Sequence, residues 1–266
     1  MRLASLGLVS IATAVLFAPA AVEAQTLSFR PQRIVIDGRT STASLTLSNG
    51  GKSEASYRIE LVDVIYNADG SVTQSQTTPA GHPSAKNLIR FSPSQVRLGP
   101  GQQQAVRILV RPPEGLAAGE YRVHAVLHQL PDVSNVKVSA APKGQVTGVL
   151  GIEQAVAIPV IVRRGQTSAT GTISAMKVVD GKPLKLDLSL ARDGNRSLYT
   201  NLLLKDKAGA VAAEVKGVAV PVPNKTRRFF FALNEKVSPA ALKAGGYTLE
   251  MVDHDTGAVI DKKPVK

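Results

Sequence analysis

The chain contains no cysteine and no tryptophan, and only four of its 266 residues are histidine. The absence of cysteine excludes a disulfide scaffold, a cysteine-ligated zinc site, an iron–sulfur cluster and a thiol nucleophile. Four histidines leave little material for a histidine-rich metal centre. Aromatic residues make up 4% of the chain, which is few for a base-stacking surface. We therefore expect neither a metal nor an organic cofactor.

The charge is strongly unbalanced, with a formal net charge of +12 and a pI near 10.0. Such a charge is compatible with nucleic acid, an acidic membrane surface or an acidic protein partner, and by itself selects none of them. The basic residues are spread over both halves of the chain. Where arginine and aromatic residues are adjacent, at Arg227–Phe231, the alternation predicts a core strand, with Phe230 on one face and Phe229 and Phe231 on the other. We expect no nucleic-acid partner.

The N-terminus has the layout of a secretory signal peptide. Arg2 precedes an apolar stretch over residues 6–18, and Val22-Glu23-Ala24 is a small-residue cleavage site before Gln25. The alternative is an N-terminal membrane anchor, although the apolar stretch is short for a span. The longest later apolar run, residues 155–162, is shorter still. Residues 1–24 are therefore predicted to be removed, leaving an exported protein without stable membrane insertion. Export without cysteine favours a bacterial periplasm or exterior.

The dominant pattern of the remaining chain alternates apolar and polar residues. Residues 44–47, 57–66, 104–110 and 119–130 follow this period of two and are bounded by Gly, Pro and Asn/Asp turns. No window of a dozen residues shows a convincing helical period. Strands spaced about 8–15 residues apart indicate a β-sandwich rather than an α/β fold.

A second set of alternating segments follows a polar, glycine-containing stretch at residues 163–168. Within this set, residues 239–242 predict a short helical turn. The pattern therefore predicts two all-β domains, residues 25–165 and residues 166–266.

No arrangement of residues suggests catalysis. His124 and His128 lie four apart on a predicted strand, which separates them by about 13 Å, too far to share a zinc ion. We interpret both as partly exposed strand residues. His82 stands alone in loop-like sequence, and Asp253 and Asp255 flank His254 in a predicted hairpin, where a solvated turn is the simpler reading. We expect a protein that is not an enzyme.

The longest strand-like run extends from Gln145 to Val162. Its even positions carry most of the bulky apolar residues, interrupted by Gly148 and Gln154. At about 3.3 Å per residue the run would span roughly 60 Å, about twice what a small domain needs. An exposed apolar strand is normally suppressed, so its presence predicts pairing with a partner by strand addition. The alternative is a strand buried entirely within its own domain.

Three segments give the sequence a resemblance to a known family. The most specific is Phe91–Ile108, with Ser92-Pro93, a short strand, Gly99-Pro100-Gly101 and a Gln/Arg strand. The others are Gly119–His124, whose strand ends in Gln129-Leu130-Pro131, and Arg33–Gly38, where an arginine precedes an apolar run and a glycine turn. These segments resemble the periplasmic pilus (fimbrial) chaperones of the chaperone–usher pathway, the PapD-like chaperones. The resemblance covers essentially the whole mature chain and is strongest over residues 29–130.

The resemblance implies two immunoglobulin-like β-sandwich domains in tandem with an inter-domain cleft. It also implies a periplasmic location, pilus or fimbrial subunits as partners and an outer-membrane usher. In this family a long strand completes the subunit by donating alternate apolar side chains, a role that falls here on Leu150 and Ile152, flanked by Val146 and Val156. An arginine and a lysine bind the subunit's terminal carboxylate, and the arginine corresponds to Arg33.

The sequence departs from the family at the second anchor, because the lysine position falls on Pro159. Arg107, on a neighbouring predicted strand, is the first candidate to replace it, and Arg163 and Arg164 are others. The alternative function is a secreted carbohydrate-binding or structural β-sandwich protein. The chain has neither tryptophan nor a clear carboxylate cluster to support that alternative.

Overall fold

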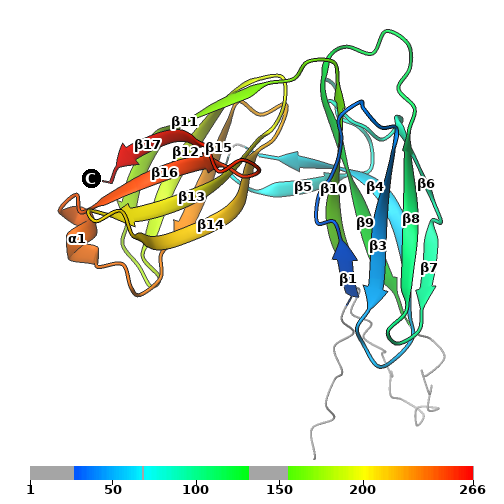
Figure 1. Cartoon of the computed structure of the whole chain (residues 1–266), viewed down its shortest axis with the longest axis horizontal. Coiled ribbons are helices and arrows are strands. Elements are labelled where there is room, and N and C mark those ends of the chain that lie inside the picture. Colours follow the sequence, from blue (N-terminus) through cyan, green and yellow to red (C-terminus); the bar gives the residue numbers. More distant parts are fainter. Residues whose placement is uncertain (1–26, 68, 132–154, 266) are drawn as a thin grey trace, which may run out of the picture.

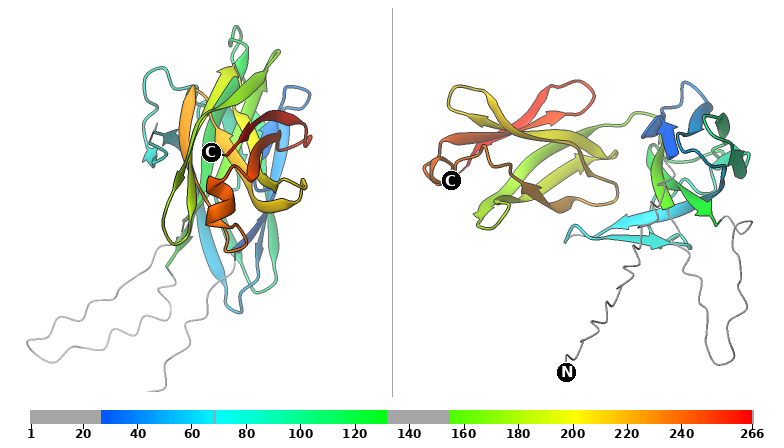
Figure 2. Two further views of the ribbon diagram at one scale, coloured as in Figure 1. Left: turned by 90° about the vertical axis from the view of Figure 1, so that its left-hand side faces the viewer. Right: turned by 90° about the horizontal axis from the view of Figure 1, so that it is seen from below.

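The computed structural model describes residues 27–67, 69–131 and 155–265, and these fold into two β-sandwiches that follow one another along the chain (Figure 1). The long axes of the sandwiches lie across each other, so the molecule is bent (Figure 2). The C-terminus lies at the end of the second sandwich that is far from the first. The expected all-β fold with two immunoglobulin-like sandwiches in tandem is confirmed. Among the described residues, no helix is long and apolar enough to cross a membrane.

Within the described residues, ten strands build the first sandwich. They are β1 (Leu27–Arg30), β2 (Ile34–Ile36), β3 (Thr42–Asn49), β4 (Ala55–Tyr66), β5 (Val72–Ser75), β6 (Ile89–Ser92), β7 (Gln95–Leu98), β8 (Gln103–Val110), β9 (Gly119–Leu130) and β10 (Ala155–Arg164). One sheet has the order β1-β3-β8-β6 and the other has the order β2-β10-β9-β4-β5, with β7 also paired to β4. Among the described strands of this sandwich, β2 pairs with β10 in parallel and the other strand pairs are antiparallel.

Seven strands and one short helix build the second sandwich. They are β11 (Ala169–Val179), β12 (Lys185–Gly194), β13 (Leu198–Asp206), β14 (Val211–Val220), β15 (Thr226–Ala232), α1 (Pro239–Lys243), β16 (Tyr247–Asp253) and β17 (Val259–Pro264). The sheets have the orders β11-β12-β15 and β14-β13-β16-β17. The helical turn expected at residues 239–242 is present as α1, and the Ser238 side chain caps it by accepting a hydrogen bond from the Ala241 N–H.

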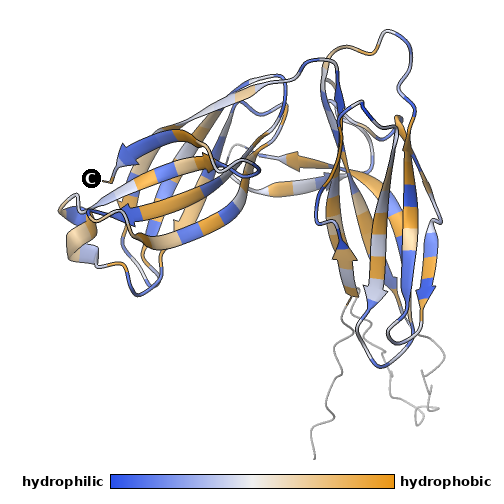
Figure 3. Cartoon of the chain, viewed as in Figure 1, coloured by the Kyte–Doolittle hydropathy of each residue, from blue (hydrophilic) through white to orange (hydrophobic). Residues whose placement is uncertain are grey.

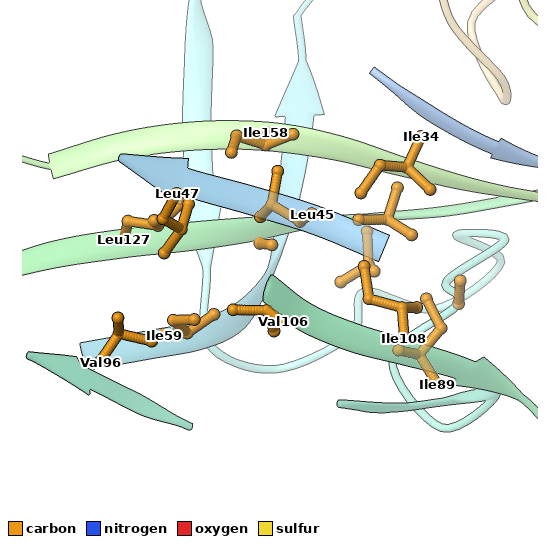
Figure 4. Close-up of a cluster of buried hydrophobic side chains, with 14 of the residues drawn as sticks. Ile34, Leu45, Leu47, Ile59, Ile89, Val96, Val106, Ile108, Leu127 and Ile158 are labelled. Atoms are coloured by element: carbon orange, nitrogen blue, oxygen red, sulfur yellow. The ribbon is translucent and has the colours of Figure 1, made fainter. Parts of the chain in front are cut away.

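The period of two in the sequence becomes the division between core and surface. Apolar and polar stripes alternate along the strands (Figure 3), and the apolar side chains of both sheets meet in the first core (Figure 4). In β10 the even positions Ile158, Val160 and Val162 are buried in this core. Each fully buried aliphatic side chain of this size stabilises the fold by about 1.5–3 kcal/mol. In β15, Phe231 is buried while Phe230 is exposed, as the alternation predicts.

Four short strands have no counterpart among the predicted segments. These are β1, β5, β6 and β17, with four to six residues each. They lie at sheet edges, where one-sided pairing leaves little alternation to detect. The predicted long strand enters the described part of the chain at Ala155, and its first half, residues 145–154, lies outside the described residues.

Candidate functional site

The first functional element is the edge of β10. This strand pairs with β9 along its whole length, from Ala155 to Arg164. On its other side, β10 pairs with β2 only over Val160–Val162. Within the described ranges no strand pairs with the outer side of residues 155–159. This half of β10 therefore presents backbone donors and acceptors to which a further strand can be added.

The four residues expected to be donated to a subunit divide into two groups. Val146, Leu150 and Ile152 lie outside the described residues. Val156 is described, and it is partly buried and packs against the core of its own sandwich. Part of the Val156 side chain is therefore already used by its own fold, and its insertion into a subunit stays a prediction.

Arg33, the expected carboxylate anchor, lies just before β2 and faces the second sandwich. Its Nη2 donates to Oδ1 of Asp255 at 2.6 Å. Its guanidinium also lies over the ring of Tyr199, with 4.2 Å between the central carbon and the ring centroid. Asp255 and Tyr199 belong to the second sandwich, so Arg33 connects the two domains.

Arg107 is not brought to Arg33 or to β10. It lies on β8, which belongs to the other sheet, between β3 and β6. Its side chain is exposed and lines a groove of about 830 Å³ that also includes Arg90. The expectation that Arg107 replaces the missing lysine is corrected here, because strands that are close in sequence are separated by the sandwich.

Pro159 lies where the sequence placed it, opposite His124 and one residue before the pairing of Val160 with Ile34. The cations near this part of the sheet come instead from other strands. Arg122 of β9 lies 5.3 Å from the centroid of the Tyr66 ring, and Arg227 of β15 lies 5.0 Å from the same centroid. Distances of this kind are those of cation–π contacts.

We call five of these residues the cation–tyrosine cluster: Arg33, Tyr66, Arg122, Tyr199 and Arg227. It combines three residues of the first sandwich with two of the second. The end of β4, which carries Tyr66, runs with β5 toward the second sandwich (Figures 1 and 2). There the Asn224 side chain donates to the Tyr66 carbonyl at 2.6 Å. The hairpin of β4 and β5 thereby holds Tyr66 against the second domain.

The cation–tyrosine cluster carries more hydrogen-bond donors than acceptors. Arg122 is 2% exposed, yet its Nε has no hydrogen-bond partner, and neither has the Nε of Arg227 or the Tyr199 hydroxyl. Burial lowers the pKa of Arg227, and the positive charge of Arg122 lowers it further. Burial also raises the pKa of Tyr199, which keeps the phenol neutral. Buried cations with unpaired donors favour an approaching anion, and a carboxylate has the matching geometry.

A hydrogen-bonded network beside the cluster fixes the two domains against each other. The Ser197 hydroxyl donates to Oε1 of the buried Glu120 and accepts from Nη1 of Arg122 at 3.3 Å. Nε of Arg163 donates to Oε2 of Glu120 at 3.2 Å. Arg163, another candidate to replace the missing lysine, is therefore already paired within the fold. Arg164 is exposed at the end of β10.

His124 differs from the expected partly exposed histidine. It is 3% exposed, packs beside the ring of Tyr66 and leaves its Nδ1 without a hydrogen-bond partner. Burial lowers its pKa to about 3, and the charges of Arg122 and His82 act in the same direction. The reason is that both faces of β9 are covered at this point, one by the core that contains Val123 and Ala125 and the other by the ring of Tyr66.

Sequence reasoning found Arg33 and missed the rest of the cluster. Tyr66 and Arg122 occupy positions that alternation assigns to the outer face of a sheet, where tyrosine and arginine are ordinary. The signal that was available is the double arginine at Arg227, which precedes a core strand. Over the part of the chain that the structure describes, no group of three or more His, Asp or Glu residues could hold a metal ion.

Comparison with known sequences gives one partial match. Residues 19–140 match a family described as an Fn3-like domain, which covers less than half of the chain. No curated protein sequence matches the chain.

Comparison with solved structures gives similarity to pilus chaperones at low sequence identity. In the complex of the chaperone CsuC with the tip subunit CsuE, from the archaic chaperone–usher Csu pili of Acinetobacter baumannii, the identity is 16%, the TM-score is 0.47, and 90% of this chain and 96% of that chain are covered. For the E. coli chaperone DraB the identity is 14%, the TM-score is 0.45, and 91% and 97% are covered. For the Pseudomonas aeruginosa chaperone CupB2 the identity is 12%, the TM-score is 0.45, and 90% and 100% are covered. These proteins are chaperones of the kind that the sequence resembles.

Proposed function

We propose that this protein is a periplasmic chaperone that binds pilus or fimbrial-type subunits by donating an edge strand and then passes them to an outer-membrane usher. The observation that carries the proposal is the outer side of β10, where residues 155–159 pair with β9 alone within the described chain. The sequence that precedes this edge continues the alternation of β10, with apolar residues at the even-numbered positions Val146, Leu150 and Ile152. A subunit that lacks one strand would find both backbone partners and apolar side chains there.

The strength of such an interaction follows from the side chains that are donated. Each inserted aliphatic side chain contributes about 1.5–3 kcal/mol before the cost of association is subtracted. Val146, Leu150 and Ile152 together would contribute about 4.5–9 kcal/mol before that cost, and the backbone hydrogen bonds of the added strand would contribute further. Release would occur by exchange, when another strand of the assembly takes the same position.

The cation–tyrosine cluster is suited to anchor the subunit's terminal carboxylate. Arg33 supplies the expected arginine. The buried guanidinium of Arg122 and the half-buried one of Arg227 would supply charge near Pro159, where the lysine is absent. A carboxylate reaching this cluster would accept hydrogen bonds from donors that lack a partner in the free protein. The anchor would set the register of the added strand along β10.

The experiment compares two double variants during co-expression with a pilus-type subunit that lacks its final strand. Leu150→Ser with Ile152→Ser removes two apolar side chains at the even positions that are proposed to be donated. Val149→Ser with Ala155→Ser is the matched control, because these residues occupy the alternate, odd positions of the same run. We expect the first variant to lose the subunit during affinity purification and the control to retain it, while circular dichroism of both resembles the wild type. Equal recovery with both variants would refute strand donation through this face.

A further inference from the structure

The contact between Arg33 and Asp255 joins residues that are 222 positions apart in the sequence. The side chain of Arg33 is 20% exposed, and that of Asp255 is 60% exposed. One face of the Arg33 guanidinium is covered by the ring of Tyr199. The carboxylate of Asp255 covers the Nη2 edge of Arg33, and with this contact in place a fifth of the Arg33 side chain is still exposed.

The turn between β16 and β17 holds Asp255 in this position. Oδ1 of Asp253 accepts hydrogen bonds from the N–H groups of Asp255 and Thr256, at 3.0 and 2.8 Å, and from the Thr256 hydroxyl at 3.0 Å. The N–H of His254 donates to the Tyr199 carbonyl at 3.1 Å. These bonds fix the backbone of the turn beside the cation–tyrosine cluster, so little conformational entropy is lost when Asp255 meets Arg33.

We infer that Asp255 is a resident carboxylate that occupies Arg33 in the free protein and that a ligand carboxylate has to displace. The inference rests on the proposed function for the identity of that ligand, the C-terminus of a bound subunit. A ligand carboxylate that binds the Nη2 edge of Arg33 competes there with Asp255. Because Asp255 is largely exposed, its side chain can turn into solvent at small cost.

The consequence is a threshold for recognition. A free carboxylate would form with Arg33 an ion pair about as favourable as the one that Asp255 already forms. It therefore has little net binding free energy and does not bind at low concentration. A subunit has the additional binding free energy of the strand that it pairs with β10, and this additional free energy allows its carboxylate to displace Asp255. The second sandwich thereby selects ligands that combine a terminal carboxylate with an open strand edge, and it rejects small anions.

The masking of Arg33 is tested without any subunit. The rate of phenylglyoxal modification of Arg33, followed by peptide mass spectrometry on the full mature chain, reports how accessible the guanidinium is. Asp255→Asn keeps the shape and removes the charge, and Asp180→Asn is the matched control, since Asp180 is an exposed aspartate paired with Lys243 at 3.0 Å. We expect modification of Arg33 to be about fivefold faster in Asp255→Asn and unchanged in the control, as for loss of an ion pair worth ~1 kcal/mol. An unchanged rate in Asp255→Asn would overturn the inference.

A second measurement separates this inference from the proposed function. N-acetyl-trialanine with a free carboxylate is added as the probe, and its C-terminal amide is the control compound. We expect the acid to protect Arg33 in Asp255→Asn at about one-fifth of the concentration needed in the wild type, and the amide to protect neither. Equal protection in both proteins would overturn displacement. Faster modification without protection by the acid would uphold the masking by Asp255 and refute Arg33 as a carboxylate anchor.

Discussion

Replacing His124 with glutamine is expected to remove most of the dependence of stability on pH between pH 5 and pH 7. His124 is 3% exposed and faces Arg122 and the ring of Tyr66, with His82 close enough to act on its charge. Burial, together with these charges, lowers its pKa from 6.5 to about 3. The folded protein therefore keeps His124 neutral at a pH where the unfolded chain protonates it.

The sign and size of the effect follow from proton linkage. Between pH 3 and pH 6.5 the unfolded state binds the extra proton, so the free energy of unfolding falls as the pH is lowered through this window. For a single histidine with these two pKa values, lowering the pH from 7 to 5 reduces the free energy of unfolding by about 2 kcal/mol. The contribution is complete above the pKa of the unfolded histidine and is lost progressively toward pH 3. The pKa of His82 is also lowered by burial, and it adds in the same direction.

The assay is urea denaturation at pH 5.0, 6.0 and 7.0, followed by circular dichroism. We expect the wild type to lose about 2 kcal/mol or more from pH 7 to pH 5 and His124→Gln to lose markedly less. His254→Gln is the matched control, because His254 lies in an exposed turn where it pairs with the Asn201 side chain. If the wild type and His124→Gln lost the same free energy of unfolding over this range, the neutral, buried state of His124 would be refuted.

Three further substitutions test the structure at separate points by urea denaturation. Ser197→Ala removes the hydroxyl between the buried groups of Glu120 and Arg122 and should lower the free energy of unfolding by about 1–3 kcal/mol. Ser174→Ala, at an exposed hydroxyl, should lower it far less, and equal losses would contradict the network. Gly194 and Gly209 both have positive φ (+97° and +83°), but only at Gly194 would an added Cβ press on a backbone carbonyl, that of Ser168. Gly194→Ala should therefore destabilise the fold more than Gly209→Ala, and the reverse order would exclude this steric explanation. Ile158→Ala should cost about 2–5 kcal/mol through the cavity it leaves, and a loss under 1 kcal/mol would place this residue outside the core.

The strands of the molecule could be predicted well because each is a local pattern. Alternation of apolar and polar residues over 57–66 and 119–130 marks β4 and β9 almost to the residue. The edge strands β5 and β17 could not be predicted in this way, since pairing on one side constrains few side chains. A period of two also cannot reveal that a second layer covers the outer face of β9. This is why His124 was expected to be partly exposed and is buried.

In the candidate site, only a residue marked by its local sequence could be predicted. Arg33 is recognisable from the apolar run and glycine that follow it. Its contact with Asp255 depends on the path of the whole second domain, which no local pattern encodes. The misplacement of Arg107 has the same origin, because the order of strands in a sheet differs from their order in the sequence. Neighbouring strands in the chain can lie on opposite sheets.

The Ser197 network has a consequence for how the two sandwiches work together. Ser197 accepts from the N–H of Val222 at 3.0 Å as well as from Arg122, and donates to Glu120, so each of its bonds has a fixed direction. Apolar contacts allow neighbouring surfaces to slide, whereas directed hydrogen bonds between buried groups do not. The two domains are thus held at one relative orientation, and the edge of β10 and the cation–tyrosine cluster keep a constant spacing. Under the proposed function, a subunit that spans both would meet a preorganised receptor and would not have to restrain a hinge as it binds.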